Sequence, residues 1–456
     1  MSSIPLDKMS WPDTLGHEPR LEEDFQDFKA GLNEIEAETE ANRCIHCYEA
    51  PCIQACPTAI NIPQFIGRIG SGNTLGAAKT ILESNILGHS CALSCPTEVL
   101  CEGACVYHHL NHKPIMIGRL QRFAVEHAYK TGAKFFVPGE PTGKRVALIG
   151  AGPASLACAH ELRRLGHEAT VYEKSALPGG LNSYGIAPYK MKTGVSLVEI
   201  EQIATLGVQF KFGEELGRTF QLSELVDSYN AVFLGLGLGP DSHPPIPGDD
   251  HPRVRGAVEF ISQLKTLPSA SLNWVRELRS ALVVGGGNTA LDACRELKGL
   301  GIPSVRVSYR RGQAEMSGYL HEFKSALQEG VEFHFNTVPV SFTSRTENSI
   351  QVEFSQTRIT HDGSITVVPT GSFVEVELVL FATGQSNFSK SKNLFAEIPG
   401  LEFDRGKLKI DPNTGQTGNP KIFSGGDLTN GGKEVVNAVS DGKRAAHGIH
   451  EVLIHG

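Results

Sequence analysis

The run RVALIGAGPASLACAHELRRLGHEATVYEK, residues 145–174, decides the fold. A short apolar strand leads through a turn at Gly150 and Gly152 into a helix, and a second strand ends at Glu173. Glycines in such a turn let the backbone approach a pyrophosphate, and the first N–H groups of the helix point at it. A carboxylate ending the second strand accepts hydrogen bonds from an adenosine ribose. The run therefore predicts a Rossmann-like dinucleotide site on a parallel sheet.

The helix of this run begins with Ala154 and Ser155, which we also expect at the nucleotide. Ser155 stands where such turns usually carry a third glycine, whose role is close packing of the helix on the strand. A small serine is compatible with that role.

The same pattern returns in SALVVGGGNTALDACRELKGLGIPSVRVSYRR, residues 280–311. The residues expected at this second nucleotide are the following: Gly285, Gly287, Asn288, Thr289, Arg310 and Arg311. The second strand ends in the two arginines instead of an acid, and guanidinium groups there suit the 2′-phosphate of NADP. We expect NADPH; in the alternative interpretation the arginines are solvated or bind the pyrophosphate, and NADH is the substrate.

Eight of the ten cysteines form two groups between Cys44 and Cys105, and in each group one cysteine precedes a proline. Closely spaced cysteines followed by proline are typical of 4Fe–4S ligation, because each iron needs one soft anionic ligand. Eight thiolates suffice for two clusters. Two zinc sites are the main alternative, and disulfides rank below them. The remaining Cys158 and Cys294 lie on expected helices and are interpreted as core thiols.

Length and charge exclude several classes. The chain has 456 residues and a formal net charge of -8, which fits about three domains of ~150 residues and gives no basic stripe for nucleic acid. The first residues are polar and acidic without the apolar core of a secretory signal, and no apolar run reaches the ~18 residues of a membrane span. We expect a cytoplasmic protein with no nucleic-acid or membrane partner.

The cysteine phrases resemble a known family. RCIHCYEAPCIQACP, SCPTEVLCEGAC and IGRLQRF, which start at residues 43, 94 and 117, are similar to the FAD and 4Fe–4S oxidoreductases related to the glutamate synthase small subunit. Within that family the likeness is to the NAD(P)H-oxidising small subunit of bacterial dihydropyrimidine dehydrogenase, and it covers almost the whole chain. The resemblance implies a first cluster on Cys44, Cys47, Cys52 and Cys105, and a second on Cys56, Cys95, Cys101 and Gln121. In the alternative, Cys91 is the fourth ligand of the second cluster and Gln121 is a surface amide.

The segment FSGGDLTNGGKEVVNAVSDGKRAA, which begins at Phe423, resembles the Gly-Asp motif of flavoenzymes with two dinucleotide domains. This likeness assigns FAD to the first nucleotide site and gives Asp427 a contact with the ribitol–pyrophosphate part. A further family contact follows Gly180 and Leu181. It is usually a Phe-Arg pair and here falls on Tyr189 and Lys190.

The expected fold is α/β, with an all-helical iron–sulfur domain followed by two Rossmann-like domains, the NAD(P) domain inserted into the FAD domain. The expected boundaries are 1–135 for the helical 4Fe–4S domain, 141–240 for the first part of the FAD domain, 241–375 for the NAD(P) domain and 376–456 for the second part of the FAD domain. An amphipathic helix is expected within residues 18–43, a helix for the run IGRLQRFAVEHAYK at residues 117–130, and a further helix from about 432 to 449.

A nicotinamide gives two electrons as hydride, a cluster accepts one at a time, and a flavin does both. The resemblance therefore implies an electron-input subunit that hands electrons to a pyrimidine-reducing flavoprotein partner, as a hetero-oligomer, without a catalytic side chain of its own. The alternatives are a glutamate synthase small subunit, a ferredoxin–NADPH reductase subunit and, from another class, a non-enzymatic zinc-binding scaffold.

Overall fold

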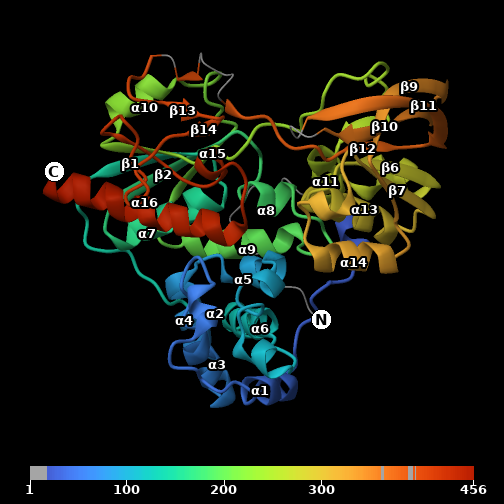
Figure 1. Cartoon of the computed structure of the whole chain (residues 1–456). Helices are drawn as coiled ribbons and strands as arrows, with labels where there is room; N and C mark the ends of the chain where they lie inside the picture. Colours follow the sequence, from blue (N-terminus) through green and yellow to red (C-terminus); the bar gives the residue numbers. More distant parts are fainter. Residues whose placement is uncertain (1–17, 361–363, 389–393, 396) are drawn as a thin grey trace.

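The computed structural model describes residues 18–360, 364–388, 394–395 and 397–456. The opening segment, whose polar composition argued against a secretory signal, lies outside the described residues up to residue 17. Figure 1 shows a helical domain below two α/β domains that stand side by side. The expected α/β class and domain order are therefore observed.

The helical domain carries the cysteines. Its elements are η2 (Leu21–Asp24), α1 (Glu34–Ala41), α2 (Pro51–Gln54), α3 (Ile62–Gly70), α4 (Thr74–Ser84), α5 (Gly88–Ser94), η3 (Thr97–Val99), η4 (Val106–Leu110) and α6 (Ile117–Lys130). Side chains of α3, α4 and α6 form its core, which includes Phe65, Ile81 and Leu120. Most cysteines lie at the ends of short helices and in the loops between them, so the backbone leaves room around their thiols.

The first nucleotide domain contains a five-stranded parallel sheet in the order β15-β4-β1-β2-β3. Its elements are β1 (Arg145–Ile149), α7 (Pro153–Arg164), β2 (Glu168–Glu173), α8 (Leu181–Tyr184), α9 (Thr193–Ala204), β3 (Gln209–Phe212), α10 (Leu222–Ser228), β4 (Ala231–Leu234), β13 (Phe403–Asp404), β14 (Lys407–Leu408), β15 (Ile422–Ser424), α15 (Asp427–Asn430) and α16 (Val435–His455). Strand β15 comes from the end of the chain, so the second domain is inserted into the first.

The second nucleotide domain has a parallel sheet in the order β5-β12-β6-β7-β8 and an antiparallel sheet β11-β10-β9. Its elements are β5 (Val254–Gly256), α11 (Ala257–Thr266), η5 (Ser269–Leu272), α12 (Asn273–Arg276), β6 (Ser280–Val284), α13 (Asn288–Gly299), β7 (Ser304–Tyr309), η6 (Gln313–Glu315), α14 (Leu320–Gln328), β8 (Glu332–Phe335), β9 (Thr337–Thr346), β10 (Ser349–Ile359), β11 (Ile365–Val376) and β12 (Val379–Phe381).

Strand β12 corrects one domain assignment. The sequence interpretation placed residues 376–456 in the FAD domain, but β12 pairs with β5 and β6 of the second sheet. The chain returns to the first domain after β12. There Gln385 forms a β-bridge with Asp241, on the segment that leaves the first domain. The two crossings between the domains therefore lie side by side.

The expected helix within residues 18–43 is also corrected. The structure has a short 3-10 turn at Leu21–Asp24 and a separate helix α1 that begins at Glu34, with an extended segment between them. Leu21 is buried in the core of the second nucleotide domain. It is apolar because it docks onto that domain, and not because it lies on the apolar face of a helix. The last helix was expected from 432 to 449 and instead spans Val435–His455.

Candidate functional site

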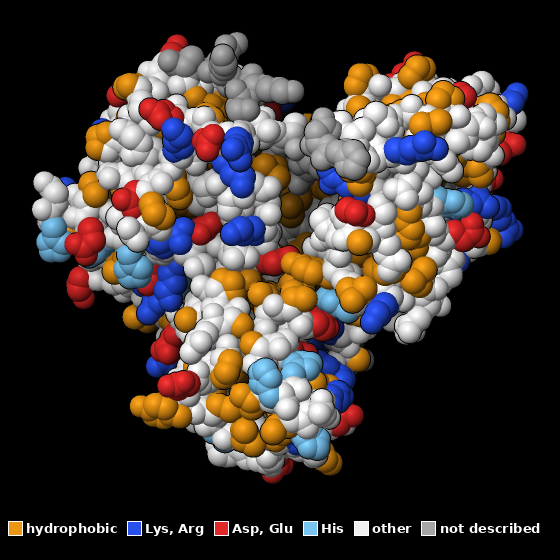
Figure 2. All heavy atoms as spheres, viewed as in Figure 1, with side chains coloured by type: hydrophobic (Ala, Val, Ile, Leu, Met, Phe, Trp, Pro, Cys, Tyr) orange, Lys and Arg blue, Asp and Glu red, His pale blue; other side chains and the backbone are white. Residues whose placement is uncertain are grey.

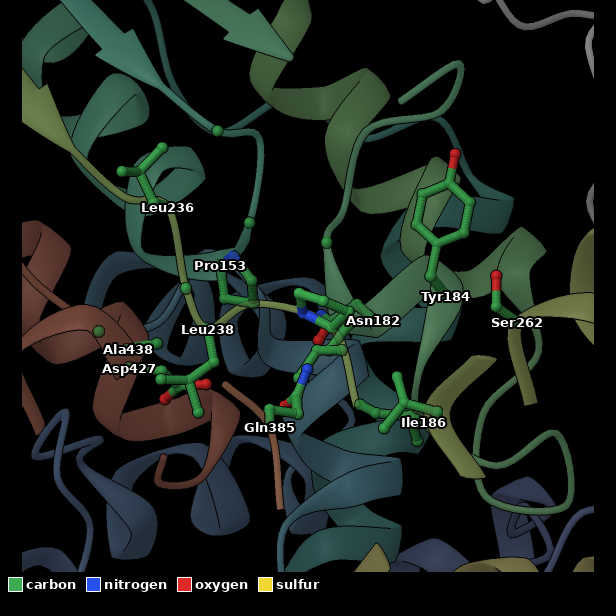
Figure 3. A pocket seen from close by; sticks show the side chains of 18 of the residues that line it. Pro153, Asn182, Tyr184, Ile186, Leu236, Leu238, Ser262, Gln385, Asp427 and Ala438 are labelled. Carbon is green, nitrogen blue, oxygen red and sulfur yellow. The ribbon is translucent and has the colours of Figure 1, made fainter. Parts of the chain in front are cut away.

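A cavity of about 980 Å³ opens where the three domains meet. Residues from all of them line it, including Gly150 of the first nucleotide domain, Asn288 of the second and Ser94 of the helical domain. Figure 3 shows Asn182, Gln385 and Asp427 gathered around this pocket from segments far apart in the sequence. A cavity of this size at the carboxyl ends of parallel strands is the usual place for a dinucleotide.

The glycine turn after β1 is shaped as the sequence predicts. Gly150 has φ +90°, and a side chain there would meet the carbonyl of Gly235 at 2.5 Å. At Gly152 a Cβ would meet nothing within 4 Å, so the space that a pyrophosphate needs is open. Ser155 is fully buried and does not line the pocket. It packs behind the turn against Gly235, which fits the packing role expected of a third glycine.

Glu173 ends β2 and lines the pocket. Its carboxylate accepts hydrogen bonds from the backbone N–H of Ala151 and of Ser175, both at 2.7 Å. The side chain is 7% exposed. Glu173 therefore holds the glycine turn closed while remaining at the pocket wall, where we expected a ribose contact.

Asp427 lines the same pocket, together with Gly180 and Leu181. Its Oδ1 accepts a hydrogen bond from the Lys433 N–H at 3.1 Å, and burial raises the pKa of its carboxyl group. Ala154 completes the set of predicted flavin residues that line the pocket. All the predicted flavin residues except Ser155 thus share one cavity.

The second glycine turn is placed differently. Of its predicted residues only Asn288 lines the pocket. Gly285 sits under the turn with φ +150°, and at Gly287 a Cβ would meet only Ser317 Oγ, at 3.5 Å, so this turn also leaves room for a ligand. Thr289 is half-buried at the start of α13.

The two predicted 2′-phosphate residues lie apart from the pocket. Arg310 is exposed and Arg311 is half-buried, directly after β7. Only their backbone carbonyls take part in described hydrogen bonds, with Thr357 and Asn336. Within the described residues no ion pair engages either guanidinium group, which leaves both available to an anion.

Lys190 lines the pocket but is held by carboxylates of the other nucleotide domain. Its Nζ lies 2.6 Å from Asp292 Oδ1 on α13 and 2.6 Å from Glu322 Oε1 on α14. Burial lowers the pKa of Lys190 and the two carboxylates raise it, with a net increase. Lys190 therefore ties the two nucleotide domains together at the pocket wall.

A second link at this wall joins Tyr319 to Glu434. The Tyr319 hydroxyl donates a hydrogen bond of 2.6 Å to Glu434 Oε1, at the residue preceding α16. Burial, followed by the bond to Glu434, raises the pKa of Tyr319. Neither Tyr319, Glu434, Asp292 nor Glu322 was predicted, because each belongs to an ordinary helical or loop pattern and only the fold brings them to the pocket.

Four of the predicted ligands share one small cavity, which we call the first thiol cavity. It is lined by Cys44, Cys47, Cys52 and Cys105. Burial and then the neighbouring thiols Cys44 and Cys105 raise the pKa of Cys52 to about 11. Crowded thiols of this kind become anionic only when a cation compensates their charge, as iron would. The set therefore fits a metal cluster.

The second thiol cavity is lined by Cys56, Cys91, Cys95, Cys101 and Gln121. Burial raises the pKa of Cys101, and the charges of Glu102, Cys95 and Cys56 add to this effect. For Cys95, a hydrogen bond with Cys91 and then burial raise the thiol pKa, while the ammonium of Lys29 lowers it. Cys91 and Gln121 both reach this cavity, so the two alternatives for a fourth ligand are both present.

The remaining thiols behave as expected. Cys158 and Cys294 are fully buried in the cores of the two nucleotide domains. In the described part of the chain, no three His, Cys, Asp or Glu side chains are arranged to hold a single metal ion. A polynuclear cluster spreads its ligands over a wider shell than one ion does.

The wall between the pocket and the second thiol cavity is one residue thick. Ser94 and Pro96 line the pocket, whereas Cys95 between them lines the thiol cavity. On α16, Val435 lines the pocket and Val436 lines the thiol cavity. A redox group in the pocket would therefore lie next to one in this cavity.

Glu199 of α9 holds the helical domain against this wall. It accepts hydrogen bonds from the backbone N–H of His89 at 2.6 Å and of Ser90 at 3.1 Å, and from the Ser90 hydroxyl. These donors open α5, the helix that leads to Cys95. Burial raises the pKa of Glu199 to about 8.

Figure 2 shows acidic and basic side chains interspersed over the nucleotide domains, and hydrophobic and histidine side chains gathered on the helical domain. In the helical domain, Ile45 lines the first thiol cavity and is 56% exposed. The adjacent Tyr48 is fully exposed. The first thiol cavity therefore lies directly under the surface. Among the described residues, no helix has both the length and the apolar character of a membrane span.

Comparison with known proteins agrees with this geometry. Residues 21–133 match the family profile described as dihydropyrimidine dehydrogenase domain II, 4Fe-4S cluster, and residues 144–442 match that of pyridine nucleotide-disulphide oxidoreductase. A NAD-dependent dihydropyrimidine dehydrogenase subunit PreT from Salmonella typhimurium is 36% identical, covering 93% of this chain and 96% of the relative. A glutamate synthase (NADPH) small chain from Escherichia coli is 32% identical, covering 93% of each.

Among solved structures, Mycobacterium tuberculosis FprA in complex with NADPH matches with a TM-score of 0.53 and 20% identity, covering 69% of this chain and 85% of that one. This likeness concerns the fold of the nucleotide domains. The family matches confirm the predicted oxidoreductase class and the predicted 4Fe–4S, FAD and NAD(P)H cofactors.

Proposed function

The chain belongs to the oxidoreductase family that contains the dihydropyrimidine dehydrogenase subunit PreT and the glutamate synthase small chain, and on this premise we propose that it is the electron-input subunit of a dihydropyrimidine dehydrogenase. It oxidises NAD(P)H and passes the electrons to a partner subunit that reduces uracil or thymine. The first relative, of nearly the same length, carries this activity in its name.

One observation carries the electron-transfer part of the proposal. The nucleotide pocket and the second thiol cavity share a wall in which Ser94 and Pro96 face one side and Cys95 faces the other. Electrons that enter the nucleotide pocket as hydride thus have only a short distance to cross to the second thiol cavity. A cluster in the first thiol cavity could then pass the electrons to the surface, where Ile45 lines that cavity and is exposed.

We assign the sites as follows. FAD is held by the pocket residues Gly150, Gly152, Ala154, Glu173, Gly180, Leu181 and Asp427, with Ser155 behind the turn and Lys190 at the wall. Bound there, FAD would supply a group that can take up a hydride and give up electrons one at a time, the form in which 4Fe–4S clusters take them. One cluster belongs to the first thiol cavity. The other belongs to Cys56, Cys95, Cys101 and Gln121.

The nicotinamide nucleotide is assigned to the turn at Gly285, Gly287, Asn288 and Thr289, with Arg310 and Arg311 at its adenosine end. Arg310 is exposed and Arg311 is half-buried, and the absence of a described ion-pair partner for either guanidinium group favours the 2′-phosphate of NADPH. Relatives of both kinds exist, one named NAD-dependent and one named for NADPH. Rates with the two nucleotides therefore have to be compared directly.

The partner we propose is a flavoprotein subunit with the pyrimidine site, joined to this chain as a hetero-oligomer. The exposed side chains of Ile45 and Tyr48 beside the first thiol cavity favour this place for electron exit. We also propose the cytoplasm as its location, because none of the ten cysteines forms a disulfide, and disulfides are rare in that compartment.

The experiment is to purify the chain anaerobically with its native partner and to measure uracil reduction driven by NADPH and by NADH. We expect turnover with uracil, and none by the isolated chain. Oxidation of NADPH that depends on glutamine and 2-oxoglutarate, without uracil turnover, would instead identify a glutamate synthase small subunit. Protein without flavin absorbance and acid-labile sulfide would contradict both.

A further inference from the structure

A segment without helix or strand, residues 25–31, links the nucleotide domains to the helical domain, and its Lys29 contacts Cys95, a residue of the second thiol cavity. We call it the strap. It begins at Phe25, which packs against residues of both nucleotide domains, and it is hydrogen-bonded to α6 of the helical domain. Arg122 of α6 donates a hydrogen bond of 2.5 Å to the Lys29 carbonyl and forms an ion pair of 2.7 Å with Asp27. Arg119 donates to the Ala30 carbonyl at 2.7 Å. The strap is thus fixed to the helix that carries Gln121.

This anchoring directs the side chain of Lys29 at the cluster ligands. Its Nζ donates a hydrogen bond of 2.7 Å to the carbonyl oxygen of Cys95 and approaches Thr97 Oγ1 at 3.3 Å. No carboxylate of the described residues forms an ion pair with it within 4.0 Å. The ammonium of Lys29 acts on the carboxyl group of Glu102 and counteracts the rise of its pKa that burial causes, but these two described groups form no ion pair. The ammonium of Lys29 therefore lies at the backbone of a ligand residue without a directly paired acid.

We propose that Lys29 is a positioning residue that places a fixed positive charge beside the second thiol cavity and thereby raises the reduction potential of the cluster bound there. The inference rests on the proposed function, because it requires a cluster on Cys95. Reduction adds one electron, and so one negative charge, to the cavity. A nearby cation stabilises that added charge, and net charge and hydrogen bonds are among the factors that set cluster potentials.

The consequence for electron flow follows from the shared wall. The second thiol cavity adjoins the nucleotide pocket, so its cluster is the first to take electrons. A neutral glutamine ligand and the ammonium of Lys29 act in the same direction, since both lower the negative charge that the added electron meets. Lys29 thus favours the step out of the pocket without contacting nucleotide or flavin.

The test is an anaerobic redox titration of the holoprotein, followed by EPR, in which the potentials of both clusters are read separately. K29M removes the charge and the hydrogen bond, K29Q keeps a donor without the charge, and K29R keeps the charge. We expect K29M and K29Q to make the second cluster about tenfold harder to reduce, about 59 mV for a one-electron couple. K29R should stay close to the wild type, and the first cluster should not shift in any variant.

A matched control is K79M on α4, which removes one lysine charge from the same domain at an exposed position. It should leave both potentials unchanged. Equal shifts in K79M and K29M, equal shifts of both clusters, or no shift in K29M and K29Q would overturn the inference. Loss of the second cluster in all three Lys29 variants would overturn it as well, because Lys29 would then be structural. A wild-type protein without a second cluster would instead refute the cluster assignment on which the inference depends.

Discussion

The side-chain Nε2 of Gln121 donates a hydrogen bond of 2.6 Å to the backbone carbonyl of Gly88. Because a carbonyl only accepts, this contact fixes which end of the amide is the NH₂ group. The oxygen Oε1 is then the atom left for the second thiol cavity that Gln121 lines. This orientation favours Gln121 as an oxygen ligand. The amide is held in it by the carbonyl of Gly88, the first residue of α5.

Replacing Gln121 should therefore affect iron binding. Gln121→Leu keeps the volume and removes the oxygen, and we expect iron and acid-labile sulfide to fall by about half, with loss of one of two EPR signals. Cys91→Ala is the companion variant and should keep full iron content. The reverse pattern, with loss in Cys91→Ala and none in Gln121→Leu, would make Cys91 the ligand.

Lys190 should be important for stability as well as for the pocket. Lys190→Met leaves Asp292 and Glu322 without their shared cation in a buried site, and breaking such a pair costs about 3–5 kcal/mol. We expect a clear fall in the melting temperature of the protein in differential scanning calorimetry, and only a small change in Lys190→Arg. If the double variant Lys190→Met/Asp292→Asn is as unstable as the sum of both single variants, the contact does not couple them.

The arginine pair after β7 should decide the nucleotide preference. Charge-assisted hydrogen bonds contribute about 1.5–3 kcal/mol, so Arg310→Ala and Arg311→Ala should raise the KM for NADPH roughly 10- to 100-fold. The KM for NADH should change little. Arg306→Ala is the control, because Arg306 lies on β7 itself and is paired with Glu332. Equal effects on both nucleotides would assign the pair to the pyrophosphate.

His167 should make stability depend on pH. Burial, and then the charge of His450, lower the pKa of His167 from 6.5 to about 4. The unfolded chain therefore binds a proton that the folded chain does not bind between these values, and stability falls as pH drops from about 6.5 towards 4. In His167→Gln the loss of stability between pH 7 and pH 5 should be smaller. An unchanged loss, measured by urea unfolding, would exclude His167 as its source.

The sequence allowed both nucleotide turns to be predicted, because Gly150, Glu173 and Gly287 follow from local backbone requirements. Helix α6 and the core thiols Cys158 and Cys294 were also predictable from helical spacing. These features depend on contacts within about thirty residues. The resemblance to a known family implied which cysteines share a cluster. In the structure each of the two implied sets lines a cavity of its own.

Other features depend on distant contacts and left no local signal. Asp292 and Glu322 resemble ordinary helix residues, although they enclose Lys190. Strand β12 has the apolar run of any buried strand, and its sequence does not say which of two sheets it joins. Leu21 and Phe25 show helical spacing, yet Leu21 packs in the core of the second nucleotide domain, and Phe25 packs against residues of both nucleotide domains. A pattern of apolar residues predicts that a side chain is buried, but it does not predict which part of the protein the side chain packs against.

The docking of Leu21 also sets an order of events during synthesis. Leu21 leaves the ribosome among the first residues, but the core that receives it includes Leu378 and Leu380, near the end of the chain. At 5–20 residues per second this interval lasts tens of seconds. During that time the strap is not anchored at its upper end, and Lys29 is held only from the side of the helical domain. Leu21 therefore cannot take its final place before β12 of the second nucleotide domain has been made.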